Sequence, residues 1–366
     1  MRLQSLDVFR GMTLALMLMV NNPGDWGNIF SPFEHADWHG CTLTDLVFPF
    51  FLFIVGVAVP YSLGKLKEAG SVNRDLYLKI GKRTLFIFLI GLALSGFPYY
   101  HFSTIRIPGV LARIAVVYGC ISLIFLKIPE KYYWIVLLYI LAIYWFLMTR
   151  IPVPGVGYAN LQAETNLGAW LDYKLLHGHL WSQSKVWDPE GILSTLPAIG
   201  TGLLGVITGI KLRSDESPIQ KLNWIFFMGC ICLVIGYFWS LVFPLNKKIW
   251  TSSFVLFTGG LAMLTLASLT YLIDILKWDS WTKHFKYFGT NSLMVFVGSG
   301  IVARLLGLIK LPQGDNKIAL KTFIYNGFKA EWLEPKVSSL LFAVCFMLFF
   351  YFILKWMYKK QLFWRM

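Results

Sequence analysis

The sequence is poor in charged residues, which excludes a soluble globular protein of ordinary composition. Only 14% of its 366 residues are charged and 57% are hydrophobic, whereas soluble domains contain about 25% charged residues. The five cysteines show no spacing typical of a disulfide framework or a metal site. Phosphate-loop, dinucleotide and serine-nucleophile signatures are also missing from the sequence. The composition therefore predicts an integral membrane protein.

Long apolar runs occupy most of the chain, and a transmembrane helix needs about 20 apolar residues. The candidate spans are ten segments, 8–21, 43–64, 83–97, 109–127, 132–149, 192–210, 222–242, 250–275, 286–309 and 337–358. No repeat, low-complexity stretch or linker divides the chain. We predict an all-α polytopic membrane protein with about ten transmembrane helices in one bundle, forming a single domain over residues 1–366.

The basic residues predict the orientation of these spans. The net charge of +14 does not indicate nucleic acid, because Lys and Arg gather in loops between apolar runs, as the positive-inside rule expects. The clearest case is the loop between the second and third spans, with Lys65, Lys67, Arg74, Lys79, Lys82 and Arg83. We predict that both termini are cytoplasmic and that segments 22–42, 98–108, 150–191, 243–249 and 310–336 face outside.

The first span is short, and a polar cluster follows it. Ten residues lie between Arg10 and Asn21, and as a helix they rise only about 15 Å, against a hydrocarbon core of about 30 Å. Either the helix extends through polar residues at one end, or the segment 22–42 dips into the bundle. The second alternative would place Asn21 and His35 inside a cavity.

His35 is a candidate general base, since the unperturbed pKa of histidine lies near neutral. The alternative is a polar surface histidine in an outer loop, and the sequence weighs the two equally. His39 would share a helix face with His35 if this stretch were helical. We disfavour a metal site at this pair, because no third histidine or glutamate motif is nearby.

Ionisable residues within spans are functional candidates by default. Asp45 opens the second span and Arg113 lies within the fourth, both near the predicted outer end. We consider both as substrate-binding residues. The alternative is an Asp–Arg pair that only ties two helices together.

Two further polar stretches flank later spans. Asp188 and Glu190 precede the sixth span and could contact substrate, although an N-cap at Asp188 is the more favoured interpretation. Trp250 ends an outer turn, where it serves as an interface anchor or as a platform for stacking a sugar. Asn291 begins the ninth span near the cytoplasmic side, where its polar group could line a cavity.

The chain resembles the heparan-alpha-glucosaminide N-acetyltransferase family of transmembrane acetyltransferases, including its bacterial relatives. No single motif would suffice, but the matching stretches run in order over nearly the whole chain. These stretches are Ser5-Leu6-Asp7-Val8-Phe9-Arg10-Gly11, Val20-Asn21, His35-Ala36-Asp37-Trp38-His39-Gly40, Thr44-Asp45-Leu46-Val47-Phe48-Pro49, Arg106-Ile107-Pro108-Gly109-Val110-Leu111, Asp188-Pro189-Glu190-Gly191-Ile192-Leu193, Asn246-Lys247 and Asn291-Ser292.

The resemblance implies transfer of acetyl from cytosolic acetyl-CoA to the amine of a terminal glucosamine across a membrane. The family's active-site histidine aligns with His35, in the pattern His-Ala-x-Trp-Asn-Gly, and a catalytically important asparagine aligns with Asn21. His39 stands here where that pattern has asparagine. The loop between Asn21 and His35 is also longer than in the lysosomal enzyme. We expect a multi-pass protein of a bacterial inner (cytoplasmic) membrane.

The expected chemistry uses His35 to accept the amine proton and Asn21 to donate a hydrogen bond to the thioester oxygen. Lys79, Lys82, Arg83 and Asn291 are the candidates for binding acetyl-CoA, which would enter from the basic inner face. The expected partners are acetyl-CoA, an amino sugar or glycan acceptor and the lipid bilayer, with no metal and no nucleic acid. A homodimer is left open. An O-acyltransferase of envelope glycan and a sugar transporter remain as alternative functions.

Overall fold

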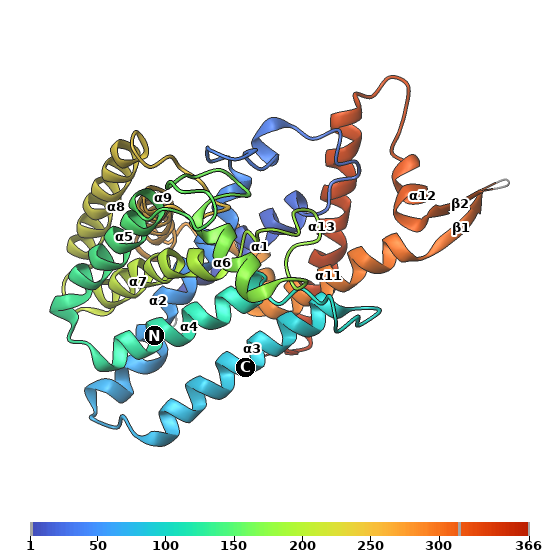
Figure 1. The fold of residues 1–366 in the computed structure, drawn as a ribbon. Coiled ribbons are helices and arrows are strands. Elements are labelled where there is room, and N and C mark those ends of the chain that lie inside the picture. Colours follow the sequence, from blue (N-terminus) through green and yellow to red (C-terminus); the bar gives the residue numbers. More distant parts are fainter. Residues whose placement is uncertain (1–2, 314–315, 365–366) are drawn as a thin grey trace. The chain divides into compact units, whose positions relative to one another are not determined.

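The computed structural model describes residues 3–313 and 316–364, and these residues are predominantly helical (Figure 1). The elements are α1 Gln4–Val20, η1 Ser31–Phe33, η2 Thr44–Leu46, α2 Val47–Glu68, α3 Arg74–Gly96, α4 Val110–Lys127, η3 Glu130–Tyr132, α5 Tyr133–Arg150, α6 Leu167–Leu176, α7 Ile192–Arg213, α8 Pro218–Ser240, α9 Ser252–Thr270, η4 Tyr271–Ile275, α10 Thr282–Thr290, α11 Ser292–Leu308, β1 Lys310–Gln313, β2 Asn316–Ala319, α12 Leu320–Asn326 and α13 Pro335–Lys359. The strands β1 and β2 pair antiparallel, with Lys310 opposite Ala319.

Seven helices within the described residues are long and apolar enough to cross a membrane. They run over Thr44–Glu68, Val110–Lys127, Glu130–Arg150, Ile192–Arg213, Pro218–Ser240, Ser252–Ile275 and Pro335–Lys359. The bent pair α10 and α11 adds an eighth crossing if it is one span. The prediction of an all-α polytopic membrane protein is confirmed.

The predicted number of about ten spans is too high by this measure, although every predicted segment is helical. Helix α1 has only 17 residues. Helix α3 carries charged residues through its first half, from Arg74 to Arg83. The predicted single span 286–309 is broken at Asn291, where α10 and α11 meet at 77°. Length, charge and a backbone break therefore account for the difference.

The chain divides into two compact units. The first unit comprises residues 1–36, 42–47 and 269–366. Within it α1 packs against α10 at very short range, because glycines stand at the crossing. A Cβ added at Gly11 would lie 1.9 Å from the carbonyl oxygen of Phe285, and one added at Gly289 would lie 2.2 Å from that of Asp7.

The second unit comprises residues 37–41 and 48–268 and contains most of α2 and α9 together with all the helices between them. Helices α2 and α7 touch along a seam of small residues, which allows their backbones to approach closely. A Cβ at Gly56 would lie 2.0 Å from the carbonyl oxygen of Gly202, and one at Gly205 would lie 2.1 Å from that of Phe53. Larger residues are therefore excluded from this seam.

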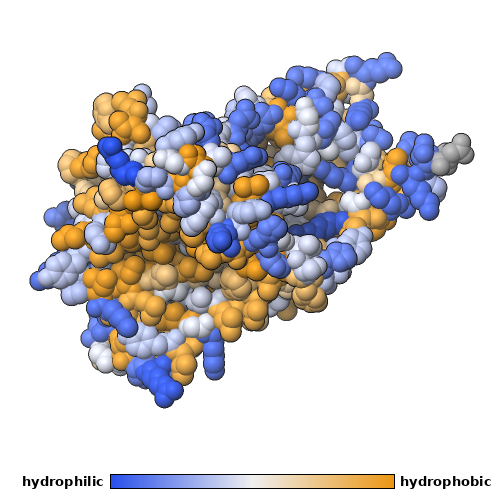
Figure 2. Space-filling view, viewed as in Figure 1, coloured by the Kyte–Doolittle hydropathy of each residue, from blue (hydrophilic) through white to orange (hydrophobic). Residues whose placement is uncertain are grey.

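Apolar side chains cover the helices of the second unit on the visible face, while hydrophilic residues gather at helix ends such as the turn between α2 and α3 (Figure 2). Many large apolar side chains on this unit are exposed, including Phe227, Phe238 and Leu241 at 62% or more. In water such an apolar face would be unfavourable, so this distribution is typical of helices that face lipid.

Candidate active site

The chain leaves α1 at Asn21 and reaches α2 through a segment with only two short 3-10 turns, η1 and η2. Asn21 ends the helix, and its backbone N–H still donates to the Met17 carbonyl at 3.1 Å. Its side chain is exposed. Helix α1 begins at Gln4, so the helix is lengthened through polar residues at its N-terminal end and rises about 25 Å. The first of the two alternatives for the short span therefore describes α1.

His35 and Asp45 form a hydrogen-bonded pair in the first unit. His35 Nδ1 lies 2.7 Å from Asp45 Oδ1. The Asp45 side chain is almost fully buried at 2% exposure, whereas the His35 side chain is 44% exposed. The pair thus consists of a buried carboxylate that is fixed in place and an imidazole that is accessible to solvent.

The carboxylate of Asp45 is fixed by hydrogen bonds from two backbone N–H groups that precede it in the sequence. Asp45 Oδ2 accepts from the backbone N–H of Ala36 at 3.0 Å and from that of Thr42 at 3.1 Å. The turn η2 supports this geometry, because the Asp45 N–H donates to the Thr42 carbonyl. These contacts leave Oδ1 directed at the His35 ring and fix the separation of the two side chains.

This arrangement suits general-base chemistry. An ionised carboxylate at Nδ1 favours the neutral tautomer with its proton on Nδ1, an assignment made from the partner's chemistry. Nε2 then carries the lone pair that can accept a proton. When it does so, the buried charge of Asp45 stabilises the imidazolium that forms.

The condition for His39 to share a helix face with His35 is not met, because residues 34–40 form bends and no helix. His39 belongs to the second unit, where its Nδ1 lies 3.4 Å from Asn246 Nδ2. Desolvation lowers the pKa of His39 below its ordinary value. Nearby, Trp38 donates through Nε1 to the Leu161 carbonyl and packs edge-on against Trp187.

Asp188 and Glu190 bind Arg106 in the second unit. Arg106 Nε donates to Asp188 Oδ2 at 2.8 Å, and its Nη2 contacts both carboxylates. Burial works against the guanidinium charge, but hydrogen bonds and charge interactions with Asp188 and Glu190 outweigh it, so the pKa of Arg106 is raised. The expectation that Asp188 caps the next helix is wrong, since the N-cap of α7 is Gly191.

Asp172, which the sequence did not single out, caps α7 instead. Its Oδ1 accepts from the backbone N–H of Ile192 at 2.8 Å. The residue is 3% exposed. Burial raises its pKa to about 6, although backbone hydrogen bonds from Ile192 and Asp188 oppose that rise. No sequence pattern marked this aspartate, because α6 lies inside a long predicted loop.

Arg113 is buried beneath the same helix start. Its Nη2 donates to the Gly191 carbonyl at 3.1 Å and to Ser194 Oγ. Nε and Nη1 are buried and have no hydrogen-bond partner among the described residues. Arg113 and Asp45 therefore each have hydrogen-bond partners within their own units.

The expectation that Trp250 is an interface anchor is wrong, because its side chain is completely buried at 0% exposure. Its Nε1 donates to Thr201 Oγ1 at 3.0 Å. The ring also packs edge-on against Phe48 and Phe254, and the Arg113 guanidinium carbon lies 5.2 Å from its centre. A sugar would find no uncovered face on this ring.

The four candidates for binding acetyl-CoA fall in two settings. Lys79, Lys82 and Arg83 are exposed on α3, and the Arg83 guanidinium carbon lies 4.8 Å from the Tyr118 ring centre. Asn291 is fully buried, and its amide is used by the chain itself. Asn291 Nδ2 donates to the Leu362 carbonyl at 3.1 Å, and its Oδ1 accepts from the Trp364 N–H at 2.8 Å.

Comparison with known proteins identifies relatives of this chain. Residues 2–237 match the family model described as heparan-alpha-glucosaminide N-acetyltransferase, catalytic. A protein named heparan-alpha-glucosaminide N-acetyltransferase from Homo sapiens is 29% identical over 357 residues, which cover 81% of this chain and 52% of that protein. The protein of the same name from Mus musculus is 26% identical over 424 residues, covering 100% and 60%. The chain thus spans about half to three fifths of the length of these curated relatives.

Proposed function

This chain belongs to the heparan-alpha-glucosaminide N-acetyltransferase catalytic family, and from that premise we propose that it is a transmembrane acetyltransferase. The proposed reaction moves acetyl from cytoplasmic acetyl-CoA to the amine of glucosamine or of a terminal glucosaminide on the outer side of the membrane. The observation that carries this proposal is the His35–Asp45 pair, an exposed imidazole oriented by a buried carboxylate.

In the proposed step, His35 Nε2 accepts a proton from the acceptor ammonium, because only the neutral amine has a lone pair to attack a thioester. The amine nitrogen forms a bond to the acetyl carbon, and the bond from that carbon to sulfur breaks. Coenzyme A leaves as a thiolate, which takes the proton held by the imidazolium, and the second proton of the attacking nitrogen is released to solvent as the amide forms. A route through an acetyl-His35 intermediate would use the same nitrogen as the nucleophile.

Asn21 is proposed to donate a hydrogen bond to the thioester oxygen as negative charge develops there. Its exposed amide at the end of α1 is compatible with this role. One donor of this kind is worth roughly 3–4 kcal/mol in the transition state. Because this stabilisation acts mainly on the transition state, loss of the amide should lower turnover more than affinity for acetyl-CoA.

Lys79, Lys82 and Arg83 are proposed to bind the phosphates of acetyl-CoA from the basic inner face, with both termini cytoplasmic and the protein in a bacterial inner membrane. Their exposure on α3 leaves their charges accessible to such a ligand. We assign Asp45 to positioning His35. We assign Arg113 to supporting the start of α7, and Asp188 and Glu190 to holding Arg106, rather than to binding the acceptor directly.

The test is a transfer assay with purified protein, labelled acetyl-CoA and free glucosamine. His35→Ala should lower turnover by about 10²–10⁴-fold while acetyl-CoA binding is kept, since general-base catalysis contributes that range. His101→Ala is the matched control, because His101 is an exposed histidine in a different loop. N-acetylglucosamine, whose amine is blocked, should not be modified.

Three results would contradict the proposal in different ways. Transfer to N-acetylglucosamine would indicate an O-acyltransferase. The absence of any transfer or hydrolysis of acetyl-CoA by the wild-type protein would favour a transporter. If His35→Ala kept more than about a tenth of wild-type turnover, the loss of rate would be smaller than the roughly 10²–10⁴-fold expected for a general base. The base would then have to be sought elsewhere.

A further inference from the structure

The second unit contains a cavity of about 290 Å³ beside the ends of three membrane-spanning helices. Glu130 and Trp134 line it from η3 and the start of α5, Lys211 and Glu216 from the end of α7 and the turn after it, and Trp224 from α8. Pockets for organic ligands usually measure about 300–1,000 Å³. Because the ends of spanning helices lie near the boundary between hydrocarbon and water, this cavity lies at the depth of lipid headgroups.

The lining along α7 changes from apolar to polar toward the end of the helix. One face of α7 contributes four lining residues at helical spacing, Ile207, Ile210, Lys211 and Ser214. The helix ends at Arg213, so the two isoleucines lie deeper in the span than the charged group. This order suits an amphipathic ligand whose apolar part runs along the helix and whose headgroup lies at its end.

Two tryptophans supply an aromatic wall. The ring centres of Trp134 and Trp224 lie 6.5 Å apart, with an angle of 57° between the ring planes. Lys211 Nζ lies 5.4 Å from the centre of the Trp224 ring. Within the described part of the chain, no cation is placed over the Trp134 ring. A ligand cation can therefore be attracted by the face of Trp134.

The charges of the lining favour a ligand that carries a cation. Lys211 is paired with Glu216. Glu130 is exposed, and none of the described residues donates a hydrogen bond to its carboxylate. Lys67 attracts the Glu130 charge, but Lys67 Nζ already donates to the Phe125 carbonyl at 2.6 Å. The cavity lining thus has two carboxylates and one ammonium, which disfavours a ligand of net negative charge.

A second tryptophan pair between the same helices shows what packing alone explains. Trp145 on α5 and Trp239 on α8 have ring centres 6.2 Å apart. They pack against a buried apolar cluster that includes Tyr144 and Phe243, and neither lines the cavity. Tryptophan near a span end is commonly an interface anchor. The cavity and its carboxylates are what distinguish the pair Trp134–Trp224 from this second pair.

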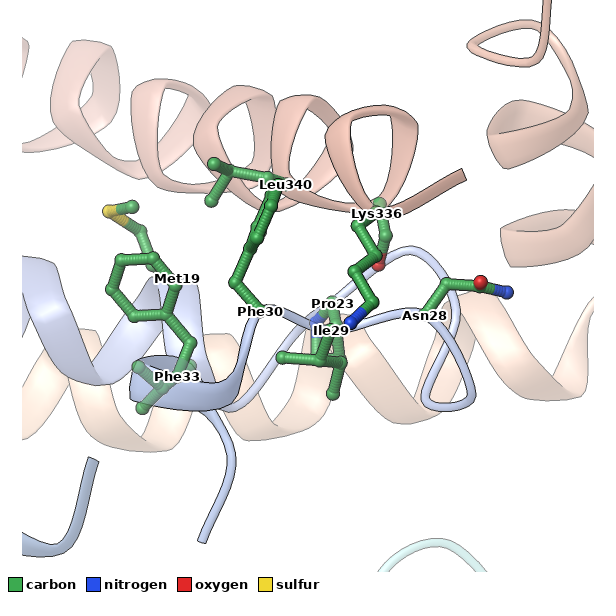
Figure 3. A pocket seen from close by; sticks show the side chains of 11 residues that line it. Met19, Pro23, Asn28, Ile29, Phe30, Phe33, Lys336 and Leu340 are labelled. Atoms are coloured by element: carbon green, nitrogen blue, oxygen red, sulfur yellow. The ribbon is translucent and has the colours of Figure 1, made fainter. Parts of the chain in front are cut away.

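A pocket of the first unit provides a contrast in size. It lies between the loop after α1 and α13, measures about 20 Å³ and is lined largely by apolar side chains such as Met19, Phe30 and Leu340 (Figure 3). A space of that size holds about one water molecule. It is therefore too small for a lipid headgroup, whereas the cavity beside α7 has room for one.

We propose that the cavity beside α7 binds the headgroup of phosphatidylethanolamine. The primary ammonium donates hydrogen bonds to Glu130 and lies against the Trp134 ring. The phosphate accepts from Lys211, whose ammonium has three N–H groups and can keep its pair with Glu216. The acyl chains run along the α7 face. A choline headgroup has no N–H to donate and a glycerol headgroup has no cation, so both fit this lining less well. The inference does not depend on acetyl transfer.

The test is native mass spectrometry of the purified protein in detergent with dilauroyl phosphatidylethanolamine, phosphatidylcholine or phosphatidylglycerol. The three lipids have the same acyl chains, so the fraction of protein with one bound lipid compares headgroups alone. Phosphatidylethanolamine should bind at least about fivefold more tightly than either other lipid, a difference of about 1 kcal/mol. An excess of free phosphoethanolamine should not displace it, because that molecule lacks the acyl chains.

Two variants of the cavity have matched controls. Glu130→Gln and Trp134→Leu should each lower the preference for phosphatidylethanolamine to less than about twofold. Glu164→Gln alters another exposed glutamate, and Trp145→Leu alters the second tryptophan pair, so both should keep the wild-type preference. The thermal unfolding midpoint of Glu130→Gln without added lipid should equal that of the wild-type protein, which separates loss of a ligand contact from loss of fold.

Equal affinity for the three lipids, a wild-type preference in Glu130→Gln, or displacement by free phosphoethanolamine would overturn the inference. A preference that both cavity variants lose and both controls keep would support it.

Discussion

The change Asp45→Asn tests the proposed base most closely, because it alters one atom of a side chain that bonds both His35 and two backbone N–H groups. In the wild-type protein, Oδ2 accepts from the backbone N–H groups of Ala36 and Thr42, and Oδ1 faces His35 Nδ1. An asparagine that keeps its oxygen toward the two N–H groups must turn its NH₂ group toward His35. If the amide were flipped, its NH₂ group would face the two backbone N–H groups, and donors facing donors cannot form hydrogen bonds.

The first of these arrangements forces a change of tautomer in His35. Nδ1 must then accept from the amide, so the ring proton moves to Nε2, the nitrogen that the proposed reaction needs as base. The imidazolium also loses a charge-assisted hydrogen bond worth about 1.5–3 kcal/mol, equivalent to roughly 10–150-fold in rate. The two effects together should bring turnover near that of His35→Ala.

The assay compares kcat with glucosamine, acetyl-CoA affinity and thermal unfolding for Asp45→Asn and for Asp37→Asn. Asp37 is an exposed aspartate of the same polar segment, and its amide variant should behave as wild type. Asp45→Asn should keep its affinity for acetyl-CoA, since the change is confined to the pair. If Asp45→Asn folded normally and kept more than about a third of wild-type kcat, the loss would be too small for the range above, and His35 would not depend on Asp45.

Two further predictions concern the second unit. Burial raises the pKa of Asp172 from 3.8 to about 6, so the folded protein binds this proton more tightly than the unfolded chain does. The stability of the fold should therefore fall as pH rises from about 4 to 6. Asp172→Asn should weaken this pH dependence, measured by thermal unfolding at pH 4.5, 5.5 and 7. An unchanged pH dependence in this variant would contradict the assignment. Reversing two charges with Lys82→Glu and Arg83→Glu should weaken acetyl-CoA binding by roughly tenfold, since exposed ion pairs contribute about 0.2–1 kcal/mol each. The control Lys174→Glu on α6 should leave the affinity for acetyl-CoA unchanged. Wild-type affinity in the double variant would mean that Lys82 and Arg83 are ordinary positive-inside residues.

Apolar periodicity was a good guide to the spanning helices. The predicted segment 109–127 corresponds to α4 at Val110–Lys127, and 192–210 corresponds to α7 at Ile192–Arg213. These elements are long, apolar and bounded by Gly or basic residues, so local signals and tertiary packing agree. The break at Asn291 was not predicted, because polar residues such as Thr290 and Asn291 are equally typical of the start of a span, and no proline marks the bend.

The candidate site was predicted less completely. His35 and Asp45 were both singled out, but as separate groups, since no periodicity connects an irregular segment with a 3-10 turn ten residues later. The role of Asp172 in capping α7 depends on a tertiary contact between α6 and the start of α7, which leaves no local pattern. For Trp250 a local pattern was present but gave the wrong prediction. Tryptophan near a span end is commonly an interface anchor, whereas here tertiary packing buries it in the core.

The seam between α2 and α7 restricts how the second unit can move. Carbonyl oxygens of Phe53 and Gly202 lie where a methyl group on the facing glycine would clash, and the α2 backbone around Val57 approaches Gly209 in the same way. Sliding or rotation of one helix on the other would bring side chains into these contacts. Interlocked backbones of this kind behave as a rigid body, since close-packed interfaces do not deform continuously. Any opening that admits or releases substrates during turnover must therefore take place along other boundaries of the protein, with α2 and α7 serving as the fixed frame of reference.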